Sequence, residues 1–140
     1  DARGVFFGMS LSTDYGAFVR AIMEGVALSM RDCMEIMPAA KKSISPIPLG
    51  GGAANSRVWC QIFADVLKRP IVRLKSGETE TLGDFIIAAE SVGLTDVTRD
   101  FGKKLAAESE VLYPDSAAAS VYDKAYQKYK AVYQNTKTLF

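Results

Sequence analysis

Apolar residues recur every three or four positions through the first third of the chain, which is the spacing of one face of an α-helix. This pattern predicts a long helix over about residues 14–36. Ser12 or Thr13 would cap its start, and Pro38 would end it because proline has no amide hydrogen to donate. Before it, the compact apolar run at residues 4–11 predicts a buried strand. The apolar positions of the helix are Phe18, Val19, Ile22, Met23, Val26, Met30, Cys33, Met34 and Met37.

Two more strand-and-helix pairs follow along the chain. Residues 43–50 predict a second strand, whose two prolines indicate an irregular or edge strand because they cannot donate to a strand ladder. The helix after this strand ends at Arg69-Pro70, and residues 70–75 predict a third strand. The next helix ends at Gly93. The apolar faces of these helices are Val58, Trp59, Ile62, Phe63, Val66 and Leu67 in the first and Leu82, Phe85, Ile86 and Ala89 in the second.

The resulting order, strand then helix three times over, predicts the α/β class, with a sheet flanked by helices and right-handed crossovers. Residues 98–109 then predict a short, charged connection that is helical or irregular. A final helix follows, capped by Asp115 or Ser116, with a stripe of Tyr122, Tyr126, Tyr129 and Tyr133 and with lysines mostly off that stripe. Such a helix either packs its tyrosines on the domain or binds single-stranded nucleic acid, and packing is the simpler interpretation.

Composition limits the function classes that the chain can serve. The 140 residues make one domain or part of one, and a net charge of +1 gives no field that would attract nucleic acid or an anionic membrane. The chain has no histidine, which excludes Ser-His and Cys-His nucleophiles and histidine-ligated metals within it. No signal peptide or membrane span is apparent. Cys33 and Cys60 are expected to be buried, reduced thiols of a cytoplasmic protein.

Three successive glycines, Gly50 to Gly52, separate the second predicted strand from the helix after it. Glycine permits positive φ and close approach of a ligand to the main chain, and the amide hydrogens that open a helix attract anions. No lysine follows as in a P-loop, and Asn55 stands where a dinucleotide fingerprint has its third glycine. A tight turn capped by Asn55 or Ser56 is the alternative, but one glycine would suffice for that. We therefore expect a phosphate or nucleotide contact here.

Several segments, in order along the chain, resemble the C-terminal lobe of the FGGY carbohydrate kinases. LGGGAANSRVWCQIFADVLKRPI carries the GGGA turn and the ADVL-x-RPI phrase of that lobe. RGVFFGMSLSTDYGAFVRAIMEGVALSMRD resembles a second signature, with its RA-x-x-EG and its helix-borne RD, although Ala17 stands where the family usually has a polar residue. GDFIIAAESVGL and the final YPD with its tyrosines resemble two later helices. Together these matches cover almost the whole chain.

This resemblance implies an actin-like ATPase fold made of ribonuclease-H-like lobes, of which this chain is part of the second. It implies ATP, with Mg²⁺ carried by the nucleotide, as the cofactor. Carried over to this sequence, Gly51, Gly52 and Ala53 line the nucleotide pocket and Gly50 makes the turn. Asn55 either hydrogen-bonds the adenine or caps the next helix, because the spacing here is one residue shorter than in the family's glycerol kinases.

The resemblance also places the remaining parts of the reaction outside residues 1–140. The family's general base is an aspartate on the first, sugar-binding lobe, and nothing in this sequence corresponds to it. Asp14, Asp65 and Asp84 lie in or beside predicted helices, where capping or ion pairing explains them. We expect residues 1–140 to be the C-terminal, nucleotide-binding fragment of a carbohydrate kinase, with no catalytic residue, inactive alone and weak in binding ATP.

The sequence gives fewer indications of the acceptor sugar and of the oligomeric state. The three-glycine turn and Gly83-Asp84 look more like the family's pentulose kinases than its glycerol kinases, so xylulose or a related pentulose is the expected acceptor. A lobe without its partner exposes apolar surface, which favours a homodimer. Two other classes stay open: a free-standing, non-catalytic module that binds nucleotide or phosphate, and a structural domain whose glycines only permit tight packing.

Overall fold

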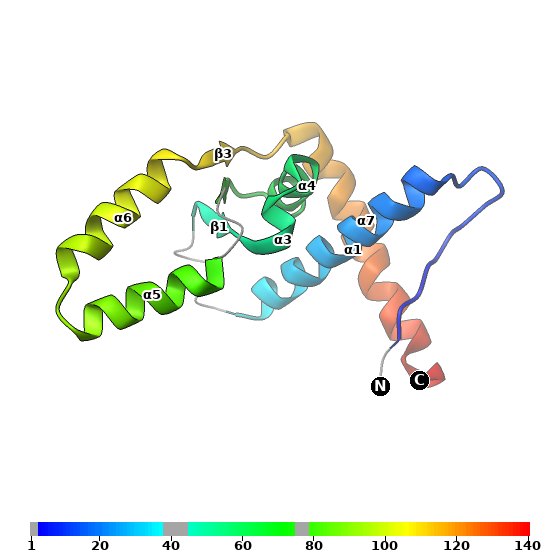
Figure 1. The fold of residues 1–140 in the computed structure, drawn as a ribbon. Helices are drawn as coiled ribbons and strands as arrows, with labels where there is room; N and C mark the ends of the chain where they lie inside the picture. Colours follow the sequence, from blue (N-terminus) through cyan, green and yellow to red (C-terminus); the bar gives the residue numbers. More distant parts are fainter. Residues whose placement is uncertain (1–2, 38–44, 75–78) are drawn as a thin grey trace.

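The computed structural model describes residues 3–37, 45–74 and 79–140 (Figure 1). Helices α1, α4 and α7 pack together beside a small sheet, while α5 and α6 extend from it as an arm, joined by an edge-to-face contact of Phe85 and Phe101. The elements are α1 (Tyr15–Ile36), β1 (Ile47–Leu49), α3 (Gly51–Ala54), α4 (Arg57–Leu67), β2 (Ile71–Arg73), α5 (Thr79–Ser91), α6 (Thr95–Ala107), β3 (Glu110–Leu112), α7 (Ser116–Thr136) and a 3-10 turn (Lys137–Leu139).

The sheet has the order β1-β2-β3, with β2 in the middle. β1 and β2 run parallel, with Ile47 opposite Ile71, which confirms the predicted strand–helix–strand unit around α4. β3 pairs with β2 antiparallel, with Leu112 opposite Ile71. The sequence did not predict β3, because its three residues carry no recognisable strand pattern. The predicted strands 43–50 and 70–75 are shorter than expected, and their residues 43, 44 and 75 lie outside the described residues.

The predicted strand at residues 4–11 is wrong. The segment before α1 forms no strand, and Phe7 is 77% exposed. A strand needs a neighbour to satisfy its backbone groups, and the described sheet places none beside this segment. The segment contacts α1 through Phe6, whose ring stacks on that of Phe18 at 4.2 Å between centroids.

The long first helix is confirmed, although its cap and its buried face differ from the prediction. Asp14, not Ser12 or Thr13, is the cap, and its carboxylate accepts a 2.6 Å hydrogen bond from the Ala17 amide. Pro38, expected to end the helix, lies outside the described residues. Only Ala27 and Leu28 of this helix are buried, while much of the predicted apolar face is exposed, including Ile22, Val26, Met30 and Cys33.

Helix α4 forms the centre of the core and contacts α1, α7, α3 and β2. It contributes more buried residues than any other described element, whereas α7 contributes the first two tyrosines of its predicted stripe. Asp115 caps α7 by accepting from the Ala117 amide, which decides between the two predicted caps. No described helix has the length and hydropathy to cross a bilayer. The main core cluster is Ala27, Leu28, Ile62, Phe63, Ala64, Val66, Ile71, Tyr122 and Tyr126.

Candidate functional site

The three glycines follow the end of β1: Gly50 precedes the short helix α3, and Gly51 and Gly52 are its first two residues. We call residues 50–55 the glycine turn. Gly50 is extended, with φ −121° and ψ −171°, and it provides no side chain to cap the amides that follow. Gly51 has φ +67°, in the left-handed region that disfavours residues with a Cβ. The turn therefore requires glycine at Gly51, whatever the turn binds.

Gly52 has no such backbone reason to be glycine. It is exposed, and a Cβ built on it meets no other atom within 4 Å. Tight packing inside the described chain therefore does not explain this glycine, contrary to the structural-domain alternative at this position. On the inner side of the turn, Ala53 is half-buried and Ala54 is 2% exposed. One side of the turn thus rests on the core, and Gly52 faces open space.

Asn55 ends α3 and donates its backbone N–H to the Gly52 carbonyl at 3.2 Å. The cap of α4 is Ser56, whose hydroxyl accepts a hydrogen bond from the Trp59 amide at 3.3 Å. The alternative in which Asn55 caps the next helix is therefore wrong. Its hydrogen bond to an adenine stays a prediction.

Arg73, the last residue of β2, donates hydrogen bonds to backbone carbonyls at the end of α3. Its Nε donates to the Ala54 carbonyl at 2.6 Å and its Nη2 to the Asn55 carbonyl at 3.4 Å. Its Nη1 donates to Glu110 of β3 at 3.1 Å, and Glu110 also accepts from Nε of Arg57 at 2.9 Å. We call Arg57, Arg73 and Glu110 the Arg73 cluster. Hydrogen bonds from Arg57 and then Arg73 hold the pKa of the Glu110 carboxyl below its usual range.

A buried cysteine completes the support under the turn. The Cys60 thiol donates to the Ala53 carbonyl at 3.5 Å, and the Ser56 amide donates to the same carbonyl at 3.2 Å. Burial raises the pKa of Cys60, so the thiol stays protonated and remains a donor. Cys33 and Cys60 are both free thiols, but only Cys60 is buried, so the prediction that both are buried is wrong for Cys33.

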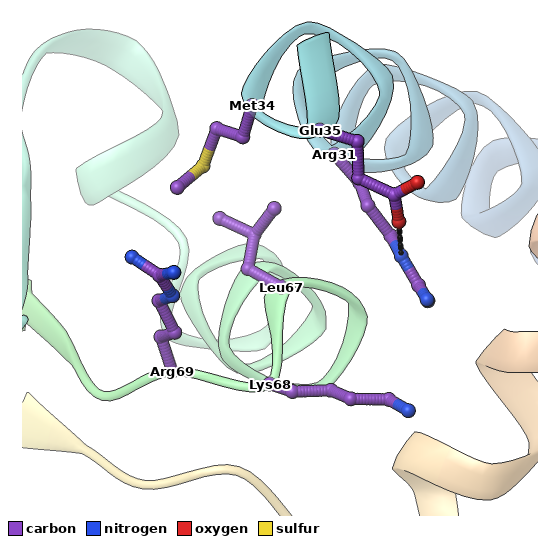
Figure 2. Close-up of a pocket in the computed structure, with 6 residues that line it drawn as sticks. All are labelled: Arg31, Met34, Glu35, Leu67, Lys68 and Arg69. Atoms are coloured by element: carbon purple, nitrogen blue, oxygen red, sulfur yellow. Dashed lines mark hydrogen bonds and ion pairs between the residues drawn. The ribbon is translucent and has the colours of Figure 1, made fainter. Parts of the chain in front are cut away.

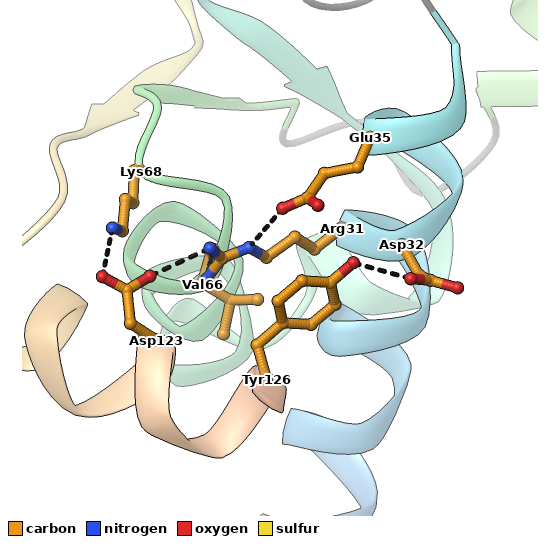
Figure 3. A network of polar contacts seen from close by, with 7 residues as sticks. All are labelled: Arg31, Asp32, Glu35, Val66, Lys68, Asp123 and Tyr126. Carbon is orange, nitrogen blue, oxygen red and sulfur yellow. Dashed lines mark hydrogen bonds and ion pairs between the residues drawn. The ribbon is translucent and has the colours of Figure 1, made fainter. Parts of the chain in front are cut away.

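A second polar cluster lies where α1, α4 and α7 meet (Figure 3). Asp123 of α7 accepts from Nη2 of Arg31 at 2.9 Å and from Nζ of Lys68 at 2.5 Å. Arg31 also donates to Glu35 at 3.3 Å and to the Val66 carbonyl at 3.4 Å. We call Arg31, Glu35, Lys68 and Asp123 the Asp123 cluster. Lys68 and then Arg31 lower the pKa of the Asp123 carboxyl.

Tyr126 packs against this cluster and is, with Tyr122, one of the two buried tyrosines of the stripe on α7. Its hydroxyl donates to Asp32 at 2.6 Å, and Arg31 and Lys130 each lie over its ring with the charge centre 4.4 Å from the ring centroid. Burial and then the bond to Asp32 raise the pKa of Tyr126 well above its usual range, so it stays neutral. This packing role agrees with the simpler interpretation of the stripe.

Two hollows lie away from the glycine turn. One of about 220 Å³ lies between the ends of α1 and α4, where Met34 and Leu67 face each other between charged groups (Figure 2). A broader groove of about 980 Å³ follows α1 and α7 beside residues 3–9 and is mostly apolar. The residues of the glycine turn line neither hollow. Within the described part of the chain, no group of three acidic or thiol side chains could hold a metal ion.

The three aspartates noted in the sequence have structural explanations or are exposed. Asp14 caps α1. Asp65 is 5% exposed and accepts from the Gln61 side chain and from the Asp115 amide, each at 2.8 Å. It therefore links α4 to the start of α7. Asp84 is exposed on α5.

Comparison with known proteins gives a consistent set of similarities. The model of the C-terminal domain of the FGGY family of carbohydrate kinases matches residues 1–92. A xylulose kinase of Staphylococcus epidermidis is 34% identical over 98% of this chain and 28% of that protein. A glycerol kinase of Myxococcus xanthus is 36% identical over 69% of this chain and 20% of that protein. The crystal structure of xylulose kinase from Rhodospirillum rubrum superposes with a TM-score of 0.69 at 30% identity, covering 99% of this chain and 28% of that one. The chain therefore spans less than a third of the length of these relatives.

Proposed function

The chain belongs to the FGGY family of carbohydrate kinases, and from this premise we propose that it is the nucleotide-binding part of an ATP-dependent kinase that phosphorylates a sugar hydroxyl. Its fold is the one that the sequence predicted, part of an actin-like ATPase lobe with a small sheet flanked by helices. The observation that supports the binding role is Gly52, which is exposed and open at the start of α3, directly after the left-handed Gly51.

In this proposal the nucleotide lies against Gly50, Gly51, Gly52 and Ala53, with Asn55 beside its adenine. Small residues allow the nucleotide to approach the backbone, and backbone amides supply hydrogen bonds without moving a side chain. In this proposal Mg²⁺ arrives with the nucleotide, bound to its phosphates. The turn would then position ATP, and Mg²⁺ would neutralise the charge that develops on the transferred phosphoryl group.

The remaining tasks fall to residues beyond this chain. Phosphoryl transfer requires in-line positioning, charge neutralisation and a base near the accepting hydroxyl. None of the three aspartates is a good candidate for this base. Asp14 caps α1, Asp65 links α4 to α7, and Asp84 lies exposed on α5. We therefore assign no catalytic residue to residues 1–140. A part that carries only nucleotide contacts should bind ATP weakly, with a dissociation constant on the order of 1 mM.

A pentulose, xylulose first, is the proposed acceptor. The similarity to a xylulose kinase runs over nearly the whole chain, whereas that to a glycerol kinase covers 69% of it. The sequence also predicts a cytoplasmic protein. It predicts a homodimer as well, and the exposed apolar faces of α1 and of residues 3–9 offer surface for that contact. A non-catalytic nucleotide-binding module remains the alternative, because it would share the same turn.

A titration of the chain with MgATP, followed by two-dimensional NMR, tests this proposal. Gly52→Val should remove saturable binding, because its side chain fills the space that the nucleotide needs. Gly102→Val is the matched control, since Gly102 also lies in a helix with nothing within 4 Å of an added Cβ. It should bind MgATP as the unchanged chain does. Equal binding by Gly52→Val and the unchanged chain would reject the turn as the nucleotide site.

A further inference from the structure

We infer that Arg73 is a positioning residue for the nucleotide, acting through the backbone of the glycine turn without touching the ligand. This inference rests on the proposed function, because it concerns the site at Gly50–Ala53. Arg73 lies on β2, while the carbonyls that it binds belong to the end of α3. It therefore joins the turn to the middle strand of the sheet.

The backbone carbonyls of Ala53, Ala54 and Asn55 all accept hydrogen bonds from donors outside α3. Arg73 binds those of Ala54 and Asn55, and the Cys60 thiol and the Ser56 amide bind that of Ala53. A helix of one turn has little stability of its own, because few backbone hydrogen bonds offset the cost of ordering it. External donors to its last carbonyls are therefore the main means of fixing the direction of its amides.

The guanidinium group suits this task better than an ammonium group would. It carries five N–H donors in a rigid plane, and here three of its nitrogens serve two adjacent carbonyls and one carboxylate. The shortest of these bonds, at 2.6 Å, goes to the Ala54 carbonyl. A lysine at this position could reach one of the carbonyls but could not fix the plane of the whole group.

Glu110 has the complementary role of holding Arg73 in place. Its two oxygens accept from different arginines, Oε1 from Arg57 and Oε2 from Arg73. Arg57 is 66% exposed on its side chain and binds the same carboxylate, whereas Arg73 is 20% exposed and also binds the turn. Arg57 is thus a natural control, since it shares the charge partner of Arg73 without its contacts to the carbonyls.

The test compares Arg73→Ala, Arg73→Lys and Arg57→Ala in the MgATP titration, with hydrogen exchange of the Gly51–Ser56 amides as the second readout. Arg73→Ala should weaken MgATP binding about tenfold and speed exchange of these amides. Arg73→Lys should recover part of both, and Arg57→Ala should change neither. If Arg73→Ala does not fold, Glu110→Gln should show the same changes in smaller measure.

The outcomes separate this inference from the proposed function. If Gly52→Val loses MgATP binding while Arg73→Ala binds as the unchanged chain does, the positioning role is wrong and the site stands. If Gly52→Val binds normally, the site itself is wrong. Equal losses in Arg57→Ala and Arg73→Ala would also overturn the inference, because they would assign the effect to Glu110 and not to the turn.

Discussion

The Arg73 cluster and the Asp123 cluster are built alike but lie in different surroundings. Each has a carboxylate from the last third of the chain between two cations, one half-buried and one exposed. In each, the less exposed arginine also donates to backbone carbonyls near the end of a helix, Ala54 and Asn55 at the end of α3 and Val66 in the last turn of α4.

The difference lies in what those carbonyls belong to. The helix α3 has four residues and faces open space at Gly52, whereas α4 has eleven residues and a buried face. Helix α4 is already held in place by its own buried face, so Arg31 only reinforces it. Arg31 itself also packs against the ring of Tyr126. Arg73 supports a turn with little packing of its own. The ion pairs of the Asp123 cluster should therefore contribute mainly to the stability of the fold, and those of the Arg73 cluster mainly to ligand binding.

Arg31→Met should give the largest effect on stability and should leave MgATP binding unchanged. It removes a guanidinium group that is 16% exposed on its side chain and leaves the carboxylate of Asp123 with Lys68 alone. We expect the free energy of unfolding to fall by about 2 kcal/mol. Urea denaturation followed by circular dichroism measures it. Arg99→Met, which removes an exposed i,i+3 pair on α6, is the control and should change stability by less than about 0.5 kcal/mol.

A loss of MgATP affinity in Arg31→Met comparable to that of Arg73→Ala would contradict the division between the two clusters. It would mean that the junction of α1, α4 and α7 is coupled to the glycine turn. Unchanged stability would instead show that the Asp123 cluster is dispensable for folding.

Tyr126→Phe should have a smaller effect of the same kind. The ring keeps its contacts with Arg31 and Lys130, but the 2.6 Å hydrogen bond to Asp32 is lost. We expect a loss of about 1 kcal/mol in the free energy of unfolding, the usual contribution of one hydrogen bond. Tyr133→Phe, at a position that is 51% exposed, should show no change. A larger loss in Tyr133→Phe than in Tyr126→Phe would refute the assignment.

Asp123→Asn should give the smallest effect, visible mainly through its pH dependence. Lys68 and Arg31 lower the pKa of Asp123 in the folded chain, so the unfolded chain takes up the proton first as the pH falls. The stabilisation is therefore present above the ordinary pKa of 3.8 and is lost as the pH falls through the lowered value. Melting temperatures should differ between Asp123→Asn and the unchanged chain at about pH 6, and this difference should shrink as the pH falls below the ordinary pKa of 3.8. A difference that grows on acidification would contradict this sign.

The sequence predicted the parts of the molecule that local patterns encode. Helical spacing predicted α1, α4 and α7, and the run of glycines predicted the turn after β1. It could not predict Glu110, because a three-residue strand is held by its neighbour β2 and not by its own residues. Arg73 stood within a predicted strand, but its bonds to Ala54 and Asn55 depend on how that strand lies beside α3. The prediction of a strand at residues 4–11 failed for the opposite reason: the residues have a strand-like apolar pattern, but no described strand lies beside them to pair with.

The most direct test of the nucleotide site replaces Mg²⁺ by paramagnetic Mn²⁺ in the ATP complex and maps which amide signals broaden. The proposal predicts selective broadening at Gly50 to Ala53, with the amides of Arg31, Lys68 and Asp123 unaffected. Signals of Gly52→Val should not broaden under the same conditions. Broadening centred on the hollow beside Leu67, or no selective broadening at the turn in the unchanged chain, would contradict the assignment of the nucleotide to the glycine turn.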